Sequence, residues 1–303
     1  MSAREVRIYE VGPRDGLQAE AAIVSTDDKL RFIGLLADAG LAEIEATSFV
    51  SPRAIPQLAD ADELMARLDR RPGVRYPVLV PNARGMGRAA SASADAICVF
   101  TAVTESYVRH NIGMSIDESL EAFAPVVERA RGAGMWTRAY VSTAFGCPYE
   151  GEVPERAVVE VGHRLLELGV DELAISDTVG VAGPSDVRRV LTALSEAGIG
   201  FDAIGLHFHD TRGTALANVI TALALGCRTF DASTGGTGGS PFAPGSAGNL
   251  ATEDLVYLLD REGVGHGVAL EGILAAARFI AQALGKELDS KVGRAGGWPA
   301  SLG

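Results

Sequence analysis

The first short apolar run of the chain and the turn that follows it read Val6-Arg7-Ile8-Tyr9-Glu10-Val11-Gly12-Pro13-Arg14-Asp15-Gly16. An open, doubly wound nucleotide-binding sheet normally carries a Gly-x-Gly-x-x-Gly fingerprint directly after its first strand. The turn over 12–16 reads Gly-Pro-Arg-Asp-Gly, which is not that fingerprint. This segment therefore favours a closed parallel barrel over an open sheet.

Beyond this segment, short β-branched runs alternate with segments of helical period along the chain. The strand candidates are 6–11, 43–49, 76–80, 96–100, 137–142, 172–176, 203–209 and 229–232. Helix candidates over 29–39 and 187–197 begin after Ser, Thr and Asp capping signals. Eight strand–helix units are what a closed parallel barrel requires, because each parallel crossover needs a helix.

We predict an α/β protein with one domain over 1–303. It is a single (β/α)8 TIM barrel over about residues 4–262, with a C-terminal helical extension over about 266–290.

Composition excludes several classes of protein. The chain has 303 residues, 27 basic against 39 acidic side chains, and a formal charge of -12 at pH 7. Nucleic-acid binders usually carry a basic surface, so nucleic acid is not an expected partner. No run of about 18 uncharged apolar residues predicts a membrane span, and the N-terminus lacks the apolar core of a signal peptide. The three cysteines show no CxxC spacing, and we expect a cytoplasmic protein.

Charged side chains fall at the ends of several predicted strands. In a parallel barrel these ends surround one mouth, where chemistry is placed. The polar residues there are Glu10, Arg14 and Asp15 after the first strand, Glu45 and Ser48 on the second, Asp177 after the sixth, and His207, His209 and Asp210 on the seventh. We therefore expect several carboxylates and two imidazoles to converge.

His207 and His209 are two residues apart on a strand, so both rings point to one face. Two neutral imidazoles and a carboxylate such as Asp15 suit a divalent cation. The alternative is a polar strand end bonded to its loops. Arg14 is either one half of a surface ion pair or a fixed charge that stabilises an oxyanion.

The segment over 235–248 reads GGTGGSPFAPGSAG and holds six glycines in fourteen residues. Such a loop is either a lid that approaches a ligand closely or a plain connector. A Walker-type phosphate loop is excluded because no Gly-Lys-Ser/Thr ending follows.

With these residues in view, the chain resembles the 3-hydroxy-3-methylglutaryl-CoA lyase family of barrel metallolyases. The segments that carry the resemblance are EVGPRDGLQ at 10–18, EATSFVSP at 45–52, GCPYEG at 146–151, SDTVGV at 176–181, HFHDTRG at 207–213 and GNLATEDLVY at 248–257. Six segments in the same order make chance similarity improbable. The resemblance implies retro-Claisen cleavage of an acyl-CoA thioester to acetyl-CoA and a 3-keto acid, by a protein that is a homodimer.

The resemblance also implies roles for individual residues. It implies a divalent cation, Mg²⁺ or Mn²⁺, held by Asp15, His207, His209 and Asn249. The catalytic set it implies is Arg14, Asp15, Glu45, His207 and Ser240, and the substrate-binding set is Glu10, Gln18, Ser48 and Asn111.

Ser240 departs from the family, which usually has a cysteine at this position of the glycine-rich loop. A serine hydroxyl is a far weaker acid than a thiol, so it cannot donate a proton in the same way near neutral pH. The alternatives are therefore a lyase for a related citramalyl-type or longer branched thioester, a Claisen-condensing synthase, or a CoA-binding protein without turnover.

Overall fold

The computed structural model describes residues 6–239 and 247–298. Its strands all run parallel in one sheet with the order β2-β1-β9-β8-β7-β6-β5-β4-β3. The strands are β1 Arg7–Glu10, β2 Glu43–Ile44, β3 Thr47–Ser48, β4 Val78–Leu79, β5 Ala96–Ala102, β6 Trp136–Ser142, β7 Glu172–Asp177, β8 Ile204–Phe208 and β9 Thr229–Ala232.

The second predicted strand closes the sheet into a barrel. It is divided into β2, which pairs with β1, and β3, which pairs with β4. Between them, the Glu45 N–H donates to the Glu10 carbonyl at 2.8 Å and the Ala46 N–H donates to the Pro77 carbonyl at 2.9 Å. One strand therefore bonds both ends of the sheet, and the predicted (β/α)8 barrel is confirmed.

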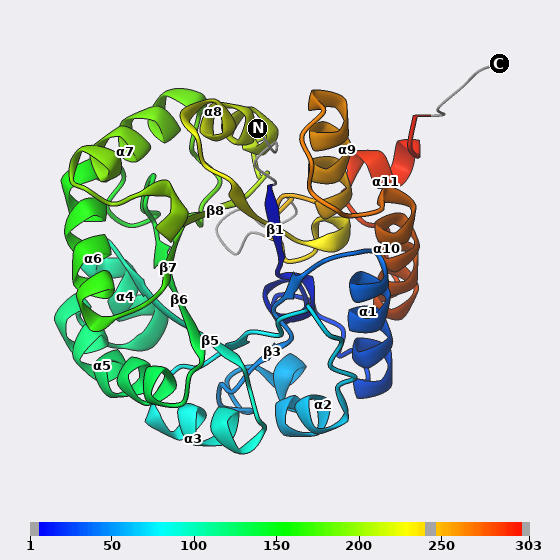
Figure 1. Cartoon of the computed structure of the whole chain (residues 1–303), viewed down its shortest axis with the longest axis horizontal. Helices are drawn as coiled ribbons and strands as arrows, with labels where there is room; N and C mark the ends of the chain where they lie inside the picture. The colour runs from blue at the N-terminus through cyan, green and yellow to red at the C-terminus, as the bar shows by residue number, and fades with distance from the viewer. Residues whose placement is uncertain (1–5, 240–246, 299–303) are drawn as a thin grey trace.

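Helices surround the barrel on its outside (Figure 1). They are α1 Thr26–Asp38, α2 Ala61–Arg67, α3 Ala83–Ser91, α4 Glu105–Ile112, α5 Ile116–Gly132, α6 Glu155–Leu168, α7 Pro184–Glu196, α8 Ala215–Leu225, α9 Thr252–Glu262, α10 Leu270–Leu284 and α11 Lys291–Ala295. Within 6–239 and 247–298, none of them has the length and apolar character needed to cross a bilayer.

Two predicted elements are shorter than expected. The third strand, predicted over 76–80, is regular only over β4, because Pro77 accepts from Ala46 but has no N–H to donate to a ladder. The C-terminal helix, predicted from residue 266, begins at Leu270 in α10. Gly267 before it has φ +74°, a left-handed conformation that a helix cannot include.

The apolar core lies between the strands and the helices, and the inside of the barrel is largely polar. Apolar residues inside it form a small cluster of Tyr9, Val11, Leu79, Cys98, Tyr140 and Ala174. The rest of the interior holds fully buried charged groups, among them Arg138, Glu172 and Asp231. Burial of charges is unfavourable unless they are paired, so each of these groups needs a partner within the barrel.

Candidate active site at the barrel mouth

A cavity of about 390 Å³ opens at the C-terminal ends of the strands. Seven side chains predicted for the site line it, namely Arg14, Asp15, Gln18, Ser48, Asn111, His207 and His209. They come from four different parts of the chain, which the barrel brings to one mouth. The two imidazoles therefore converge with one strand-end carboxylate, Asp15, whereas Glu10, Glu45, Asp177 and Asp210 do not line the cavity.

Arg14 is a buried cation held by two carboxylates. It lies in the tight π-helical turn Gly12–Gly16. Its Nε and Nη2 donate to the Glu45 carboxylate at 2.9 and 3.2 Å, and its Nη1 donates to Asp15 Oδ1 at 2.7 Å. Only 5 % of the Arg14 surface is exposed. Its ion pairs are therefore buried, which excludes the alternative of a solvated surface pair. Burial lowers the pKa of Arg14, but Glu45 and Asp15 outweigh burial and raise it well above its ordinary value.

These contacts leave part of the guanidinium free. Arginine has five N–H groups, and three of them are used by Glu45 and Asp15. One N–H on each terminal nitrogen has no partner in the part of the chain that the structure describes. Because Arg14 lines the cavity, these donors can bind an oxygen of a molecule inside it.

Asp15, His207 and His209 form the metal-type cluster of the site. Each offers one ligand atom, and these atoms lie within 4.8 Å of one another. The two rings have centroids 5.2 Å apart, as their alternate positions on one strand predicted. His209 Nδ1 is buried without a hydrogen-bond partner among residues 6–239 and 247–298. A carboxylate, two imidazoles and an unsatisfied ring nitrogen fit a divalent cation.

The protonation states of two of these groups suit cation binding. Burial, and then the nearby His207, lower the pKa of His209 to about 3, so the ring is neutral. Burial raises the pKa of Asp15, but the charge of Arg14 and then that of His207 have the larger opposite effect. The pKa of Asp15 is therefore lowered to about 2. A neutral imidazole and an ionised carboxylate are the forms that bind metal ions.

Asn249 lies beside this cluster but contacts it through its amide nitrogen. Nδ2 donates to Asp15 Oδ2 at 2.8 Å and to the Thr237 carbonyl at 3.1 Å. In this arrangement Asn249 holds the Asp15 carboxylate in place. Contact with a cation would require its amide oxygen, because an amide nitrogen has no lone pair to give.

Glu10 does not line the cavity, contrary to the expectation that it contacts the substrate. Its carboxylate is fully buried and accepts four hydrogen bonds, from the N–H groups of Gly12 and Thr234 and from the hydroxyls of Thr234 and Thr252. Glu10 thus ties the turn that carries Arg14 to the loop that follows β9. Glu10 is absent from the cavity because its side chain points to the outer side of β1, toward the helices.

Replacing Glu10 by Ala is expected to lower the free energy of unfolding by about 3 kcal/mol, because four buried donors lose their acceptor. Urea denaturation of the purified variant measures this loss. Glu63→Ala, an exposed change on α2, is the control and should alter stability by less than about 0.5 kcal/mol. A loss below about 1 kcal/mol for Glu10→Ala would show that the four bonds contribute little.

Ser240 and the centre of the glycine-rich loop, 240–246, lie outside the described residues. The residues before it are described, and Gly238 and Gly239 line the cavity. A Cβ on Gly238 would lie 2.7 Å from Asn249 Nδ2, so only glycine fits beside that amide. The backbone at Gly238 therefore lies close to Asn249 and Asp15.

Other polar groups of the site had no role in the sequence-based interpretation. Tyr140 lines the cavity and donates to Glu45, while Arg138 and Asp231 lie beneath His207 inside the barrel. Arg138 and Asp231 could have been found from the sequence, because each is a charged residue within a parallel strand. Such strands are normally apolar throughout. Asp177, which the strand-end pattern did indicate, instead accepts from the Val181 and Ala182 N–H groups and holds a turn.

The fold and the site together define a class of protein. A (β/α)8 barrel that gathers a carboxylate, two imidazoles and a buried arginine at the C-terminal ends of its strands is a barrel enzyme with a site suited to a divalent cation.

Comparison with known proteins identifies the family. The HMGL-like family model matches residues 5–280. A hydroxymethylglutaryl-CoA lyase of Bacillus subtilis is 48% identical over 288 residues, which is 95% of this chain and 96% of that protein. The chain belongs to the HMGL-like family, as the sequence motifs predicted.

Solved structures agree with this assignment. The crystal structure of the Bacillus subtilis HMG-CoA lyase superposes with a TM-score of 0.95 at 47% identity, covering 97% of this chain and 99% of that one. An HMG-CoA lyase from Acinetobacter baumannii, in complex with coenzyme A and 3-methylmalate, has a TM-score of 0.94 at 36% identity and covers 100% of this chain and 99% of its own.

Proposed function

We propose that the chain cleaves 3-hydroxy-3-methylglutaryl-CoA to acetyl-CoA and acetoacetate, with a divalent cation as its cofactor. The observation that carries this proposal is the placement of Arg14 beside the Asp15, His207 and His209 cluster in one cavity, with two N–H donors that no described residue occupies. Near full-length similarity to hydroxymethylglutaryl-CoA lyases supports the same reaction.

The reaction breaks one carbon–carbon bond and moves two protons. The tertiary hydroxyl on C3 loses its proton, the C3–O bond becomes the ketone of acetoacetate, and the C2–C3 bond breaks. Its electron pair remains on C2 as the thioester enolate, which then takes a proton to become the acetyl group. Negative charge thus develops on the thioester oxygen only as the bond breaks.

A bound cation, Mg²⁺ or Mn²⁺, would be held by Asp15, His207 and His209, and would polarise the substrate oxygens and make the hydroxyl more acidic. Arg14 would donate its free N–H groups to the thioester oxygen and stabilise the enolate. Glu45 holds Arg14 in that position with two bonds. The ionised Asp15 carboxylate, which is bonded to Arg14 and lies close to both imidazoles, would hold the cation next to the hydroxyl that loses its proton.

The walls of the cavity suit the rest of the thioester. Ser48, Gln18 and Asn111 provide polar groups that would orient the carboxylate and the thioester. Val50, Ala54, Ile55 and Ile112 form an apolar wall that would accommodate the pantetheine arm of CoA. A small polar centre with an apolar approach is what an acyl-CoA requires.

Acetyl-CoA release from purified protein tests the proposal. With Mg²⁺ or Mn²⁺ present, 3-hydroxy-3-methylglutaryl-CoA should be cleaved, and a chelator should abolish turnover until metal is restored. Citramalyl-CoA and longer branched thioesters are tested in parallel. Preferential cleavage of one of these would replace the proposed substrate, and no release from any thioester would overturn the lyase function.

Ser240 allows a separate prediction about proton transfer to C2. Because a thiol is a much stronger acid than an alcohol, Ser240→Cys is expected to raise kcat for 3-hydroxy-3-methylglutaryl-CoA. Steady-state kinetics, compared with Ser240→Ala as a control, measure the change. Equal kcat values for the Ser, Ala and Cys enzymes would mean that this side chain takes no part in protonation.

The cysteines support a reducing compartment. Cys98, Cys147 and Cys227 are all buried and free, as in proteins of the cytoplasm, where thiols stay reduced. We accordingly propose a cytoplasmic location. The homodimer predicted from the family resemblance stays a prediction, which light scattering of the purified protein would test.

A further inference from the structure

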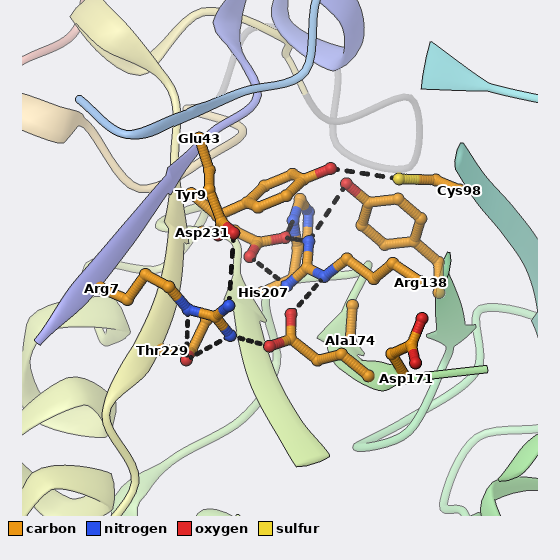
Figure 2. A network of polar contacts seen from close by, with 12 residues as sticks. Arg7, Tyr9, Glu43, Cys98, Arg138, Asp171, Ala174, His207, Thr229 and Asp231 are labelled. Carbon is orange, nitrogen blue, oxygen red and sulfur yellow. Dashed lines mark hydrogen bonds and ion pairs between the residues drawn. The ribbon is translucent and has the colours of Figure 1, made fainter. Parts of the chain in front are cut away.

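His207 differs from His209 in having a buried carboxylate partner. Nδ1 of His207 lies 3.1 Å from Asp231 Oδ2, whereas Nδ1 of His209 has no partner in the described part of the chain. Figure 2 shows His207 and Asp231 together with Arg138 inside the barrel, connected by dashed lines. None of the motifs that indicated the active site includes Asp231 or Arg138.

The contacts of Asp231 determine which partner donates in this bond. Arg138 Nη1 donates to Asp231 Oδ2 at 2.9 Å, and Nη2 donates to Oδ1 at 2.6 Å. An arginine in a protein stays protonated, and a carboxylate that it pairs with in this bidentate way stays ionised and can only accept. His207 must therefore carry its proton on Nδ1 and donate it to Asp231. A neutral ring with its proton on Nδ1 has its lone pair on Nε2.

Arg138 is itself held in one position by neighbouring strands. Its Nε donates to Glu172 Oε1 at 2.8 Å, and the other oxygen of Glu172 pairs with Arg7 near the opposite end of the barrel. A Cβ on Gly205, two residues before His207 on β8, would overlap Arg138 Nη2. Strands β6, β7, β8 and β9 thus combine to fix the guanidinium, and through it the orientation of Asp231.

We propose that Asp231, oriented by Arg138, is a positioning residue that fixes the Nδ1–H tautomer of His207 and directs Nε2 toward Asp15 and His209. A carboxylate behind a metal-binding histidine orients the ring and makes it a better ligand. This inference rests on the cation requirement of the proposed function, and it does not depend on which thioester is cleaved.

The tautomer can be measured in the unaltered protein. Long-range ¹H–¹⁵N NMR spectra of metal-free, ¹⁵N-histidine-labelled protein, assigned with a His207→Gln variant, distinguish the two neutral forms. We expect the His207 proton on Nδ1. A proton on Nε2 in the folded protein would overturn the proposal, and this measurement requires no change at Asp231.

Cation affinity gives a second readout. Asp231→Asn is expected to weaken Mn²⁺ binding, followed by EPR without substrate, by about 10- to 100-fold, and to populate the Nε2–H tautomer. Asp254→Asn is the matched control. Asp254 is a similarly buried aspartate on α9 that accepts hydrogen bonds from the Ser290 hydroxyl and from the Lys291 and Val292 N–H groups, so it should lose stability without changing Mn²⁺ affinity.

Outcomes that contradict the proposal are distinct from failure of the lyase function. A folded Asp231→Asn protein with unchanged Mn²⁺ affinity and an unchanged His207 tautomer would overturn the proposal.

If Asp231→Asn does not fold, Gly205→Ala serves instead, because its methyl group displaces the Arg138 guanidinium without removing a charge. We expect a weaker loss of Mn²⁺ affinity for Gly205→Ala, and unchanged affinity would count against the proposal. Neither readout uses a thioester, so both remain valid if the substrate is a different one.

Discussion

Replacing Arg14 by Gln is expected to lower kcat for thioester cleavage by about 1,000-fold, while KM changes by less than about 10-fold. Arg14 is preorganised by its bonds to Glu45 and Asp15, and it lines the cavity with two N–H groups that have no partner among the described residues. The charge that they stabilise forms only as the C2–C3 bond breaks. Loss of the guanidinium therefore affects the transition state much more than the bound substrate. Steady-state kinetics at saturating metal measure both constants.

Two further observations separate this effect from misfolding. Arg14→Lys keeps a positive charge but cannot form the paired bonds to Glu45, so it should recover only part of the lost kcat. Thermal unfolding and circular dichroism check that both variants retain the fold. A kcat for Arg14→Gln within about 10-fold of the unaltered enzyme would remove Arg14 from the chemistry and restrict it to a structural role.

Replacing Asp15 by Asn is expected to weaken Mn²⁺ binding by more than about 100-fold. It removes one of the three proposed ligands, and loss of a carboxylate that only supports a ligand already costs about 10- to 100-fold. Asp15 is the carboxylate of the cluster with His207 and His209, and asparagine keeps its size while losing its charge. An EPR titration of metal-depleted protein with Mn²⁺ gives the dissociation constant without any need for substrate.

Asp27→Asn is the control for this experiment, because Asp27 is an exposed side chain on α1 that pairs with Arg67 on the surface. Its Mn²⁺ affinity should equal that of the unaltered protein. Tight Mn²⁺ binding by Asp15→Asn would show that the cation site lies elsewhere in the cavity or does not use this carboxylate. The assignment of the two imidazoles would then need to be tested by His207→Gln and His209→Gln.

The main features of the fold were predictable from the sequence because they depend on local pattern. Alternation of apolar strands with helical segments indicates a parallel α/β fold, and the count of eight units favours the closed barrel. The strand-end rule then places Arg14, Asp15, His207 and His209 at one mouth. The spacing of the two histidines on one strand was sufficient to place their rings side by side. Division of the second strand into β2 and β3 was not predictable, because it depends on which neighbour each backbone N–H meets.

The role of Glu10 was misjudged for a related reason. A charged residue at the end of a strand is consistent both with a catalytic position and with a buried acceptor for loop N–H groups. Only the position of the loop after β9, more than 220 residues away in sequence, decides between them. Long-range contacts of this kind leave no periodic signal.

Sequence alone determined the barrel, the family and the residue types at the mouth, because these follow from local periodicity and from short motifs. Tertiary structure decided how the buried charges are paired. Arg138, Glu172, Asp231 and His207 lie on four different strands, and their contacts depend on strand register and on the space left by Gly205. Because a buried charge must find a partner across strands, this network became visible only once the strands were packed together.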